Sequence, residues 1–219
     1  IYYNIGCLLF ELGKIHQANY YFKKSKNLNP NFADISWRQS LCALTLKDFK
    51  NGFSLYEDRW KRENHPNKKF DNIKSPNNIS DIKDKKILIW DEQGLGDTIN
   101  FSRFVIDTLK HTKKITFVVD KKLKDILSNL DKKIYVVDYE NLNNINYDFQ
   151  IALGSLPKLL NITTTDDIKF YKLFLPKKNV QVDYIDNNKF NIGLAWSGNP
   201  NYPMDKYRSI PFDKFDKLL

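Results

Sequence analysis

The stretch KILIWDEQGLGDTINFSRF, Lys86–Phe104, decides the predicted fold. It opens with the apolar run Ile87–Trp90, rich in β-branched and aromatic side chains, which is typical of a strand buried in a parallel sheet. A tight turn with Gly94 and Gly96 follows. Asp97 then stands where a helix would be capped, ahead of a helical apolar pattern. Strand, glycine turn and helix form the first half of a βαβ unit.

The glycine turn has two interpretations. Glycine permits unusual backbone angles and close approach of a ligand, and a helix start offers unpaired N–H groups. A carboxylate at Asp97 would compete with a phosphate, so we expect Gly94, Gly96, Asp97 and Thr98 to bind a base or a hydroxyl group. The alternative is a plain βα turn without chemistry. The stretch lacks the third glycine of a dinucleotide-binding motif and the Gly-Lys-Ser/Thr end of a P-loop.

Strand and helix patterns continue to alternate after this stretch. Further strands are predicted at Ile115–Val119, Ile134–Val137 and Asp148–Leu153, and helices at Leu123–Leu130 and from Ser155 onward, with Pro157 in the first turn. This order predicts an α/β fold with a parallel sheet covered by helices on both faces. A ligand would bind at the carboxyl ends of the strands, where the glycine turn lies.

The amino-terminal part, residues 1–60, has an all-helical pattern. Its motif spacing is that of a 34-residue helix–turn–helix repeat of the tetratricopeptide type. Small residues at Gly6 and Ala18 would let two helices approach closely. Shifting the numbering by 34 places Ser40 on Gly6 and Gly52 on Ala18, so a second copy is predicted.

The repeat breaks down at one position. Ser25 of the first copy falls on Arg59 of the second, which is not a small residue. A plain helical bundle packed on the next domain is therefore the alternative to a repeat. Two repeats rarely hold a solenoid together, because each buries its face only on its neighbours.

Two polar segments, residues 61–85 and Asp183–Lys189, divide the rest of the chain. Residues 61–85 contain two prolines among many Asn and Lys, which predicts a linker before a Rossmann-like domain over residues 86–182. A new strand is predicted at Ile192–Trp196 and a helix at Phe212–Leu219. Residues 190–219 are therefore interpreted as the first βα unit of a second, truncated sheet domain.

The turn after that last strand is a second candidate site. Ser197, Gly198 and Asn199 form a small, donor-rich turn at the strand's carboxyl end. Arg208 could present its guanidinium fork to a phosphate. A surface arginine without a ligand is the alternative for Arg208.

The composition bounds the class of protein. The chain has 219 residues, of which 42% are hydrophobic, enough for substantial cores. The net charge of +9 is spread along the chain without a single basic stripe, so nucleic-acid binding is not favoured. No apolar run is long enough for a membrane span.

Two further features concern the cellular compartment of the protein and the extent of its sequence. Cys7 and Cys42 both lie among apolar residues in helical patterns, which predicts packed free thiols in a reducing compartment, and so a cytoplasmic protein. The sequence begins at Ile1 and stops inside a predicted helix. We therefore expect it to be a fragment.

Three ordered motifs carry a resemblance to a known family: WDEQGLGDTINFSRF (Trp90–Phe104), DFQIALGSLPKLL (Asp148–Leu160) and IGLAWSGNPNYPMDKYRSIPF (Ile192–Phe212). Together they resemble glycosyltransferases of the family 9, heptosyltransferase-like type that are linked to tetratricopeptide repeats. GFSLYEDRW (Gly52–Trp60) is similar to the helix that ends their repeat region. The linker departs from the pattern, because SPNNIS has asparagines where relatives often carry a tryptophan and a glycine.

The resemblance implies a GT-B architecture, in which two Rossmann-like domains face each other across the active-site cleft. The first would hold the acceptor and the second a nucleotide-sugar, which is a substrate; no metal and no cofactor would be needed. In such enzymes the Asp of the glycine turn is the general base, which here is Asp97. The resemblance also implies contacts from Ser197, Gly198, Asn199 and Arg208 to the donor phosphates.

We therefore expect the parent protein to transfer a sugar from a nucleotide-sugar to an acceptor hydroxyl. The helical repeats would bind a protein or glycan acceptor, or another partner. Because most of the donor domain would be missing, the fragment alone should be inactive. The rival is a non-catalytic repeat scaffold, a protein-interaction module with a Rossmann-like domain.

Overall fold

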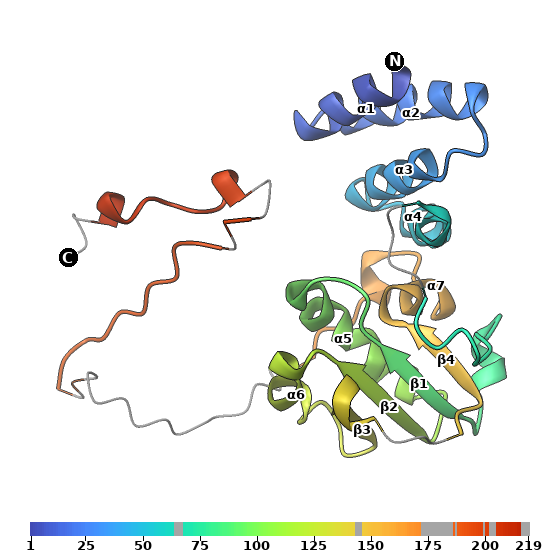
Figure 1. The fold of residues 1–219 in the computed structure, drawn as a ribbon, viewed down its shortest axis with the longest axis vertical. Coiled ribbons are helices and arrows are strands. Elements are labelled where there is room, and N and C mark those ends of the chain that lie inside the picture. Colours follow the sequence, from blue (N-terminus) through green and yellow to red (C-terminus); the bar gives the residue numbers. More distant parts are fainter. Residues whose placement is uncertain are drawn as a thin grey trace. The chain divides into compact units, whose positions relative to one another are not determined.

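The computed structural model describes residues 1–63, 68–142, 146–171, 186, 188–198, 200–201 and 205–215. The chain forms two compact units, Ile1–Pro176 and Lys177–Leu219. The first is an α/β unit (Figure 1). In the described part of the second unit, regular structure is limited to two short 3-10 turns, η6 (Asp205–Tyr207) and η7 (Phe212–Phe215).

Four helices begin the first unit. They are α1 (Tyr2–Glu11), α2 (Ile15–Leu28), α3 (Ala33–Thr45) and α4 (Phe49–Tyr56), and the 3-10 turn η1 (Glu57–Lys61) continues α4. Helix α1 packs on α2, α2 on α3 and α3 on α4, which makes two successive hairpins (Figure 1). The predicted helical region is therefore confirmed, and its assignment to the tetratricopeptide type stays a prediction.

The two hairpins turn in the same way. Helices α2 and α4 begin at Ile15 and Phe49, whose numbers differ by the 34 residues of the predicted repeat. Two residues before each start, Gly13 and Lys47 have left-handed backbones with φ of 73° and 63°. The N–H group of each donates to the carbonyl three residues earlier, at 2.9 and 3.0 Å. Local turn geometry therefore repeats even though the residue type does not.

The small positions of the predicted repeat lie where helices approach closely. A Cβ added to Gly6 would lie 2.6 Å from the ring of Phe22, and one added to Gly52 would lie 2.6 Å from the side chain of Leu44. The two cysteines are free, as predicted: Cys42 is buried in this helical region. The helices can therefore pack this closely because Gly6 and Gly52 have no side chain where the helices meet.

Replacing Lys47 by glycine should stabilise the first unit. Lys47 is exposed, and its left-handed backbone disfavours a residue with a Cβ. We expect the free energy of unfolding in urea to rise by about 0.5–1 kcal/mol, since part of the gain is offset by the greater freedom of unfolded glycine. Gly13→Ala is the matched change and should lose a similar amount. No gain in the first variant and no loss in the second would contradict the shared turn.

The rest of the first unit is a parallel sheet with its connecting helices. Its elements are β1 (Lys86–Trp90), α5 (Leu95–Leu109), β2 (Lys114–Val119), α6 (Lys121–Leu127), β3 (Ile134–Asp138), β4 (Phe149–Ala152) and α7 (Leu156–Leu159). The strand order is β3-β2-β1-β4 and all pairs are parallel. The predicted parallel sheet is confirmed, and the direction of strand addition reverses between β1 and β4.

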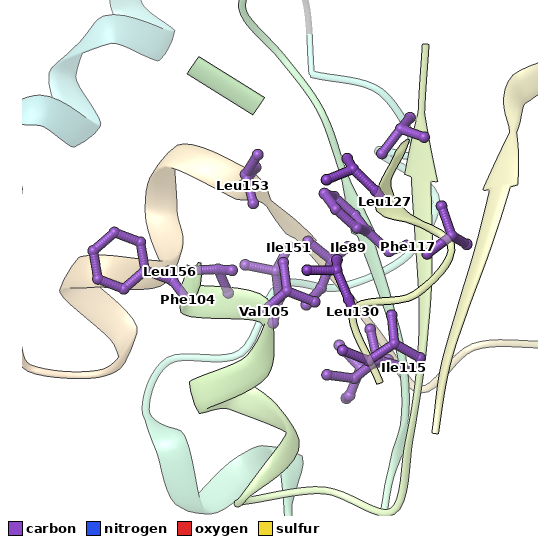
Figure 2. Close-up of a cluster of buried hydrophobic side chains, with 14 of the residues drawn as sticks. Ile89, Phe104, Val105, Ile115, Phe117, Leu127, Leu130, Ile151, Leu153 and Leu156 are labelled. Carbon is purple, nitrogen blue, oxygen red and sulfur yellow. The ribbon is translucent and has the colours of Figure 1, made fainter. Parts of the chain in front are cut away.

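One face of the sheet carries the main core. Side chains of the strands, such as Ile89 and Phe117, pack there with Phe104 and Val105 of α5 and Leu127 of α6 (Figure 2). Alternate residues point to opposite faces of a strand, so the neighbouring positions belong to the other face. Helices of the sheet region therefore cover this face, as predicted.

The opposite face is covered differently from the prediction. Its buried side chains include Leu88 and Trp90. The partly buried side chains that cover them are Trp60, Phe70, Ile73, Tyr139, Leu142 and Tyr147. The supposed linker is therefore partly structural, although it contains no α-helix in its described residues. The few apolar residues of this segment are separated by polar ones, so the sequence shows no periodic apolar pattern here.

The second unit does not form its predicted strand. Residues Ile192–Trp196 have no regular structure, and within the predicted helix Phe212–Leu219 the described residues form only the short turn η7. A strand needs a neighbour for its hydrogen bonds, and none is present among the described residues of this unit. Instead Trp196 packs against Phe212 at 5.0 Å between ring centroids, and its carbonyl accepts from the Ile210 N–H at 2.8 Å.

Two carboxylates make the first unit sensitive to acid. The Lys124 ammonium lowers the pKa of Asp138 to about 2, and the backbone N–H of Thr163 does the same for Asp167, against an ordinary value of 3.8. Both therefore contribute stability that is present above pH 4 and is lost as the pH falls towards 2. Asp167→Asn should reduce the slope of unfolding free energy against pH in this window. An unchanged slope, with Asp166→Asn as control, would contradict this contribution.

Candidate functional site

The candidate site lies at the carboxyl ends of β1 and β4, where the strand order reverses. The loop Asp91–Gly94 meets the turn Leu153–Ser155 here, because the Gly154 N–H donates to the Glu92 carboxylate at 2.8 Å. Helix α5 already begins at Leu95, with Gly94 as its N-cap. The expectation that Asp97 caps the helix was therefore wrong.

The two glycines do not serve the turn by unusual backbone angles. Gly94 has a φ of −67°, and the described glycine with a left-handed backbone is Gly13. A Cβ on Gly96 would meet no atom within 4 Å, whereas one on Gly94 would lie 3.3 Å from Oδ2 of Asp97. Open space for a ligand to approach the backbone is therefore present at Gly96, whereas at Gly94 the Asp97 carboxylate lies close.

Asp97 is exposed in the first turn of α5 and borders a small hollow. The hollow measures about 10 Å³, enough for one water or hydroxyl oxygen. Thr98 also lines it but is buried, and its hydroxyl donates to the Gly94 carbonyl at 3.3 Å. Of the predicted residues of the first site, Asp97 and Thr98 therefore line the hollow, and Asp97 is the exposed one of these two.

The crevice between the ends of β1 and β4 is filled by a protein side chain. Arg59 of η1 is fully buried, and its Nε and Nη2 donate to Glu92 at 2.8 and 2.7 Å. Its Nη1 donates to Glu57 and its Nη2 to Ser155, both at 2.8 Å. The usual ligand position in such a sheet is therefore occupied by the guanidinium that joins the helical region to the sheet. The sequence prediction missed both Arg59 and Glu92 as parts of this site.

Charged side chains of both signs lie at the two ends of the parallel strands. At the carboxyl ends, Lys124 pairs with Asp138 at 2.8 Å and Lys69 lies 3.8 Å from Asp91. At the amino ends, Lys86 pairs in register with Lys114, and the Lys86 N–H donates to Asp148 at 2.7 Å. The expectation that charge is spread along the chain without a single basic stripe therefore stays a prediction.

Asp91 has a structural role beside this site. Its carboxylate accepts from the Asp120 N–H at 2.7 Å and from the hydroxyl of Tyr139. Burial, together with the nearby Asp91 carboxylate, raises the pKa of Tyr139, so its hydroxyl stays protonated and donates. These bonds hold the loops after β1, β2 and β3 together.

The second unit brings two predicted donor-site residues together. A Cβ on Gly198 would lie 2.8 Å from Nη2 of Arg208, whose Nε is bonded to Asp205 at 3.0 Å. The Gly198 N–H donates to the Ser209 hydroxyl at 2.9 Å. Bonds from Ser209 and then from Arg208 lower the pKa of Asp205. A phosphate at this turn would therefore compete with bonds inside the protein.

The remaining predicted residues of the second site give less information. Ser197 is exposed, and Asn199 lies outside the described residues. Within the part of the chain that the structure describes, no three His, Cys, Asp or Glu side chains gather as metal ligands, and none of the helices could span a membrane. No family profile, curated protein or solved structure matches the chain.

Proposed function

We propose that this chain belongs to a metal-independent glycosyltransferase of the GT-B type, with a nucleotide-sugar as donor. The observation that carries the proposal is the exposed carboxylate of Asp97 beside a hollow of hydroxyl size, at the carboxyl end of β1 in a parallel sheet. General-base help of this kind contributes typically 10²–10⁴ in rate.

In the proposed reaction an acceptor hydroxyl donates its proton to Asp97. The hydroxyl oxygen forms a bond to the anomeric carbon of the donor as the bond from that carbon to the diphosphate oxygen breaks. The nucleoside diphosphate leaves with the electron pair. Ser197, Gly198, Asn199 and Arg208 are proposed to meet its phosphates, as hydrogen-bond donors do where charge develops.

The helical hairpins are proposed to be repeats of the tetratricopeptide type that bind a protein or glycan acceptor in the cytoplasm. Their support is the 34-residue offset between the two turns. The buried bonds of Arg59 to Glu92 hold the hairpins to the same unit as Asp97. An acceptor bound there would keep a fixed relation to the base.

A repeat scaffold without catalysis is the second candidate. The filling of the strand-end crevice by Arg59 favours it, since this leaves only the small hollow beside Asp97. A scaffold would bind partners through the helical hairpins and turn over no nucleotide-sugar.

A donor screen distinguishes the two candidates. The protein is incubated with UDP-, GDP-, ADP- and CMP-sugars together with a panel of peptide and glycan acceptors, and release of the nucleotide is followed. The transferase proposal predicts release with at least one donor, and a raised KM for that donor in Arg208→Ala. Absence of release with every donor would support the scaffold.

A further inference from the structure

A second cavity of the first unit lies away from the Asp97 hollow. It measures about 460 Å³ and lies between η1, residues 75–79 and the start of α7, beside the edge strand β4. Arg59 separates the two spaces, since Glu57 and Ser155 line the cavity while Glu92 lines the hollow. A volume of this order falls in the range of small-molecule sites.

Two successive hydrogen bonds lie at the floor of the cavity, one from Trp90 to Gln150 and one from Gln150 to Ser75. Gln150 is 3% exposed in the middle of the otherwise apolar strand β4, where an unbonded amide would be costly. Its Oε1 accepts from Trp90 Nε1 at 2.6 Å, and its Nε2 donates to Ser75 Oγ at 2.9 Å. Ser75 has its own O–H left to donate, and no acceptor for it lies among the described residues. The chain of bonds therefore ends in a donor at the cavity.

The facing wall offers acceptors and further amides. The Glu57 carboxylate is 26% exposed, and its Oε2 accepts from the Ser155 hydroxyl at 3.1 Å. Asn161 lines the same space from a left-handed backbone, with a φ of 54°. The half-buried indole of Trp60 adds an aromatic surface, backed by the Arg59 guanidinium at 4.3 Å from its ring centroid.

This combination of hydrogen-bond donors, acceptors and an aromatic surface favours one class of ligand. An apolar ligand would leave the Ser75, Asn161 and Glu57 groups unbonded. Lys68 and Lys158 line the cavity as well as Glu57, so its charges are of both signs and do not by themselves select an anion or a cation. A sugar ring presents hydroxyls that donate and accept at once, together with C–H groups that pack on an indole. We infer that the cavity beside β4 binds a saccharide unit. This inference does not depend on the transfer reaction proposed for Asp97.

A glycan-binding experiment tests the inference. The protein is applied to a printed array of bacterial and eukaryotic glycans, and the glycan with the strongest signal is then titrated in solution by nuclear magnetic resonance. Ser75→Ala should weaken its binding about fivefold, the effect of one hydrogen bond, and Asn161→Gly should do the same while keeping the left-handed backbone. The exposed Ser128→Ala is the matched control and should bind as wild type.

The outcomes separate this site from the proposed active site. Asp97→Asn should bind the glycan as wild type does, because Asp97 borders the other space. Absence of binding to every glycan on the array would overturn the inference. Binding that neither Ser75→Ala nor Asn161→Gly weakens, in variants with wild-type melting temperatures, would also overturn it.

Discussion

Replacing Arg59 by methionine should lower the free energy of unfolding of the first unit by about 3–5 kcal/mol. The Glu92 side chain is 3% exposed, so without Arg59 its carboxylate would be buried with no cation beside it. Desolvation of an unpaired charge costs more than the loss of a surface ion pair. Urea denaturation followed by tryptophan fluorescence measures the change.

A matched control exists in the same segment. Arg62 pairs with Asp34 at 2.6 Å, but both side chains are more than 20% exposed, so Arg62→Met should cost about 1 kcal/mol or less. The double variant Arg59→Met with Glu92→Met should recover much of the loss, since it removes both charges. A loss below 1 kcal/mol in Arg59→Met alone would contradict the role of Arg59 in joining the hairpins to the sheet.

Replacing Asp97 by asparagine should lower the steady-state turnover of the proposed transferase by roughly 10²–10⁴. Asparagine fills the same space but cannot take the proton of the acceptor hydroxyl. The exposed position means that stability should change by no more than about 0.5 kcal/mol. The measurement is the rate of nucleotide release with saturating donor and acceptor.

Asp120→Asn is the control for this prediction. Asp120 directly follows β2, where its side chain caps α6, and it does not line the hollow beside Asp97. It should retain most of the turnover, whereas Asp97→Asn should not. Equal effects of the two changes would mean that turnover responds to the loss of any carboxylate at these strand ends and that Asp97 has no special role.

Local pattern in the sequence was enough to predict the sheet and its helices. The apolar runs at β1, β2 and β3 begin within one residue of their predicted positions, because a buried parallel strand needs a continuous apolar run. The start of α5 was misplaced because Asp97 is a common capping residue and Gly94 is a weaker signal. The helical hairpins followed from small residues at fixed spacing.

Features that depend on long-range contacts could not be predicted in the same way. Arg59 and Glu92 are 33 residues apart, and neither belongs to a local pattern that indicates their pairing. The one available signal was that Arg59 is a large residue at the position where the first repeat copy has Ser25. The pairing of Lys86 with Lys114 likewise arises from the register of β1 and β2. The strand predicted at Ile192–Trp196 failed because apolar pattern alone cannot supply a partner strand.

The most direct test of the proposed site is a single-turnover measurement with enzyme in excess over a labelled nucleotide-sugar. This condition isolates sugar transfer from product release. We expect wild-type protein to transfer the sugar to the acceptor, and Asp97→Asn to bind the same amount of donor while transferring it roughly 10²–10⁴ times more slowly. Equal transfer rates in the two proteins would contradict the assignment of Asp97 as the base.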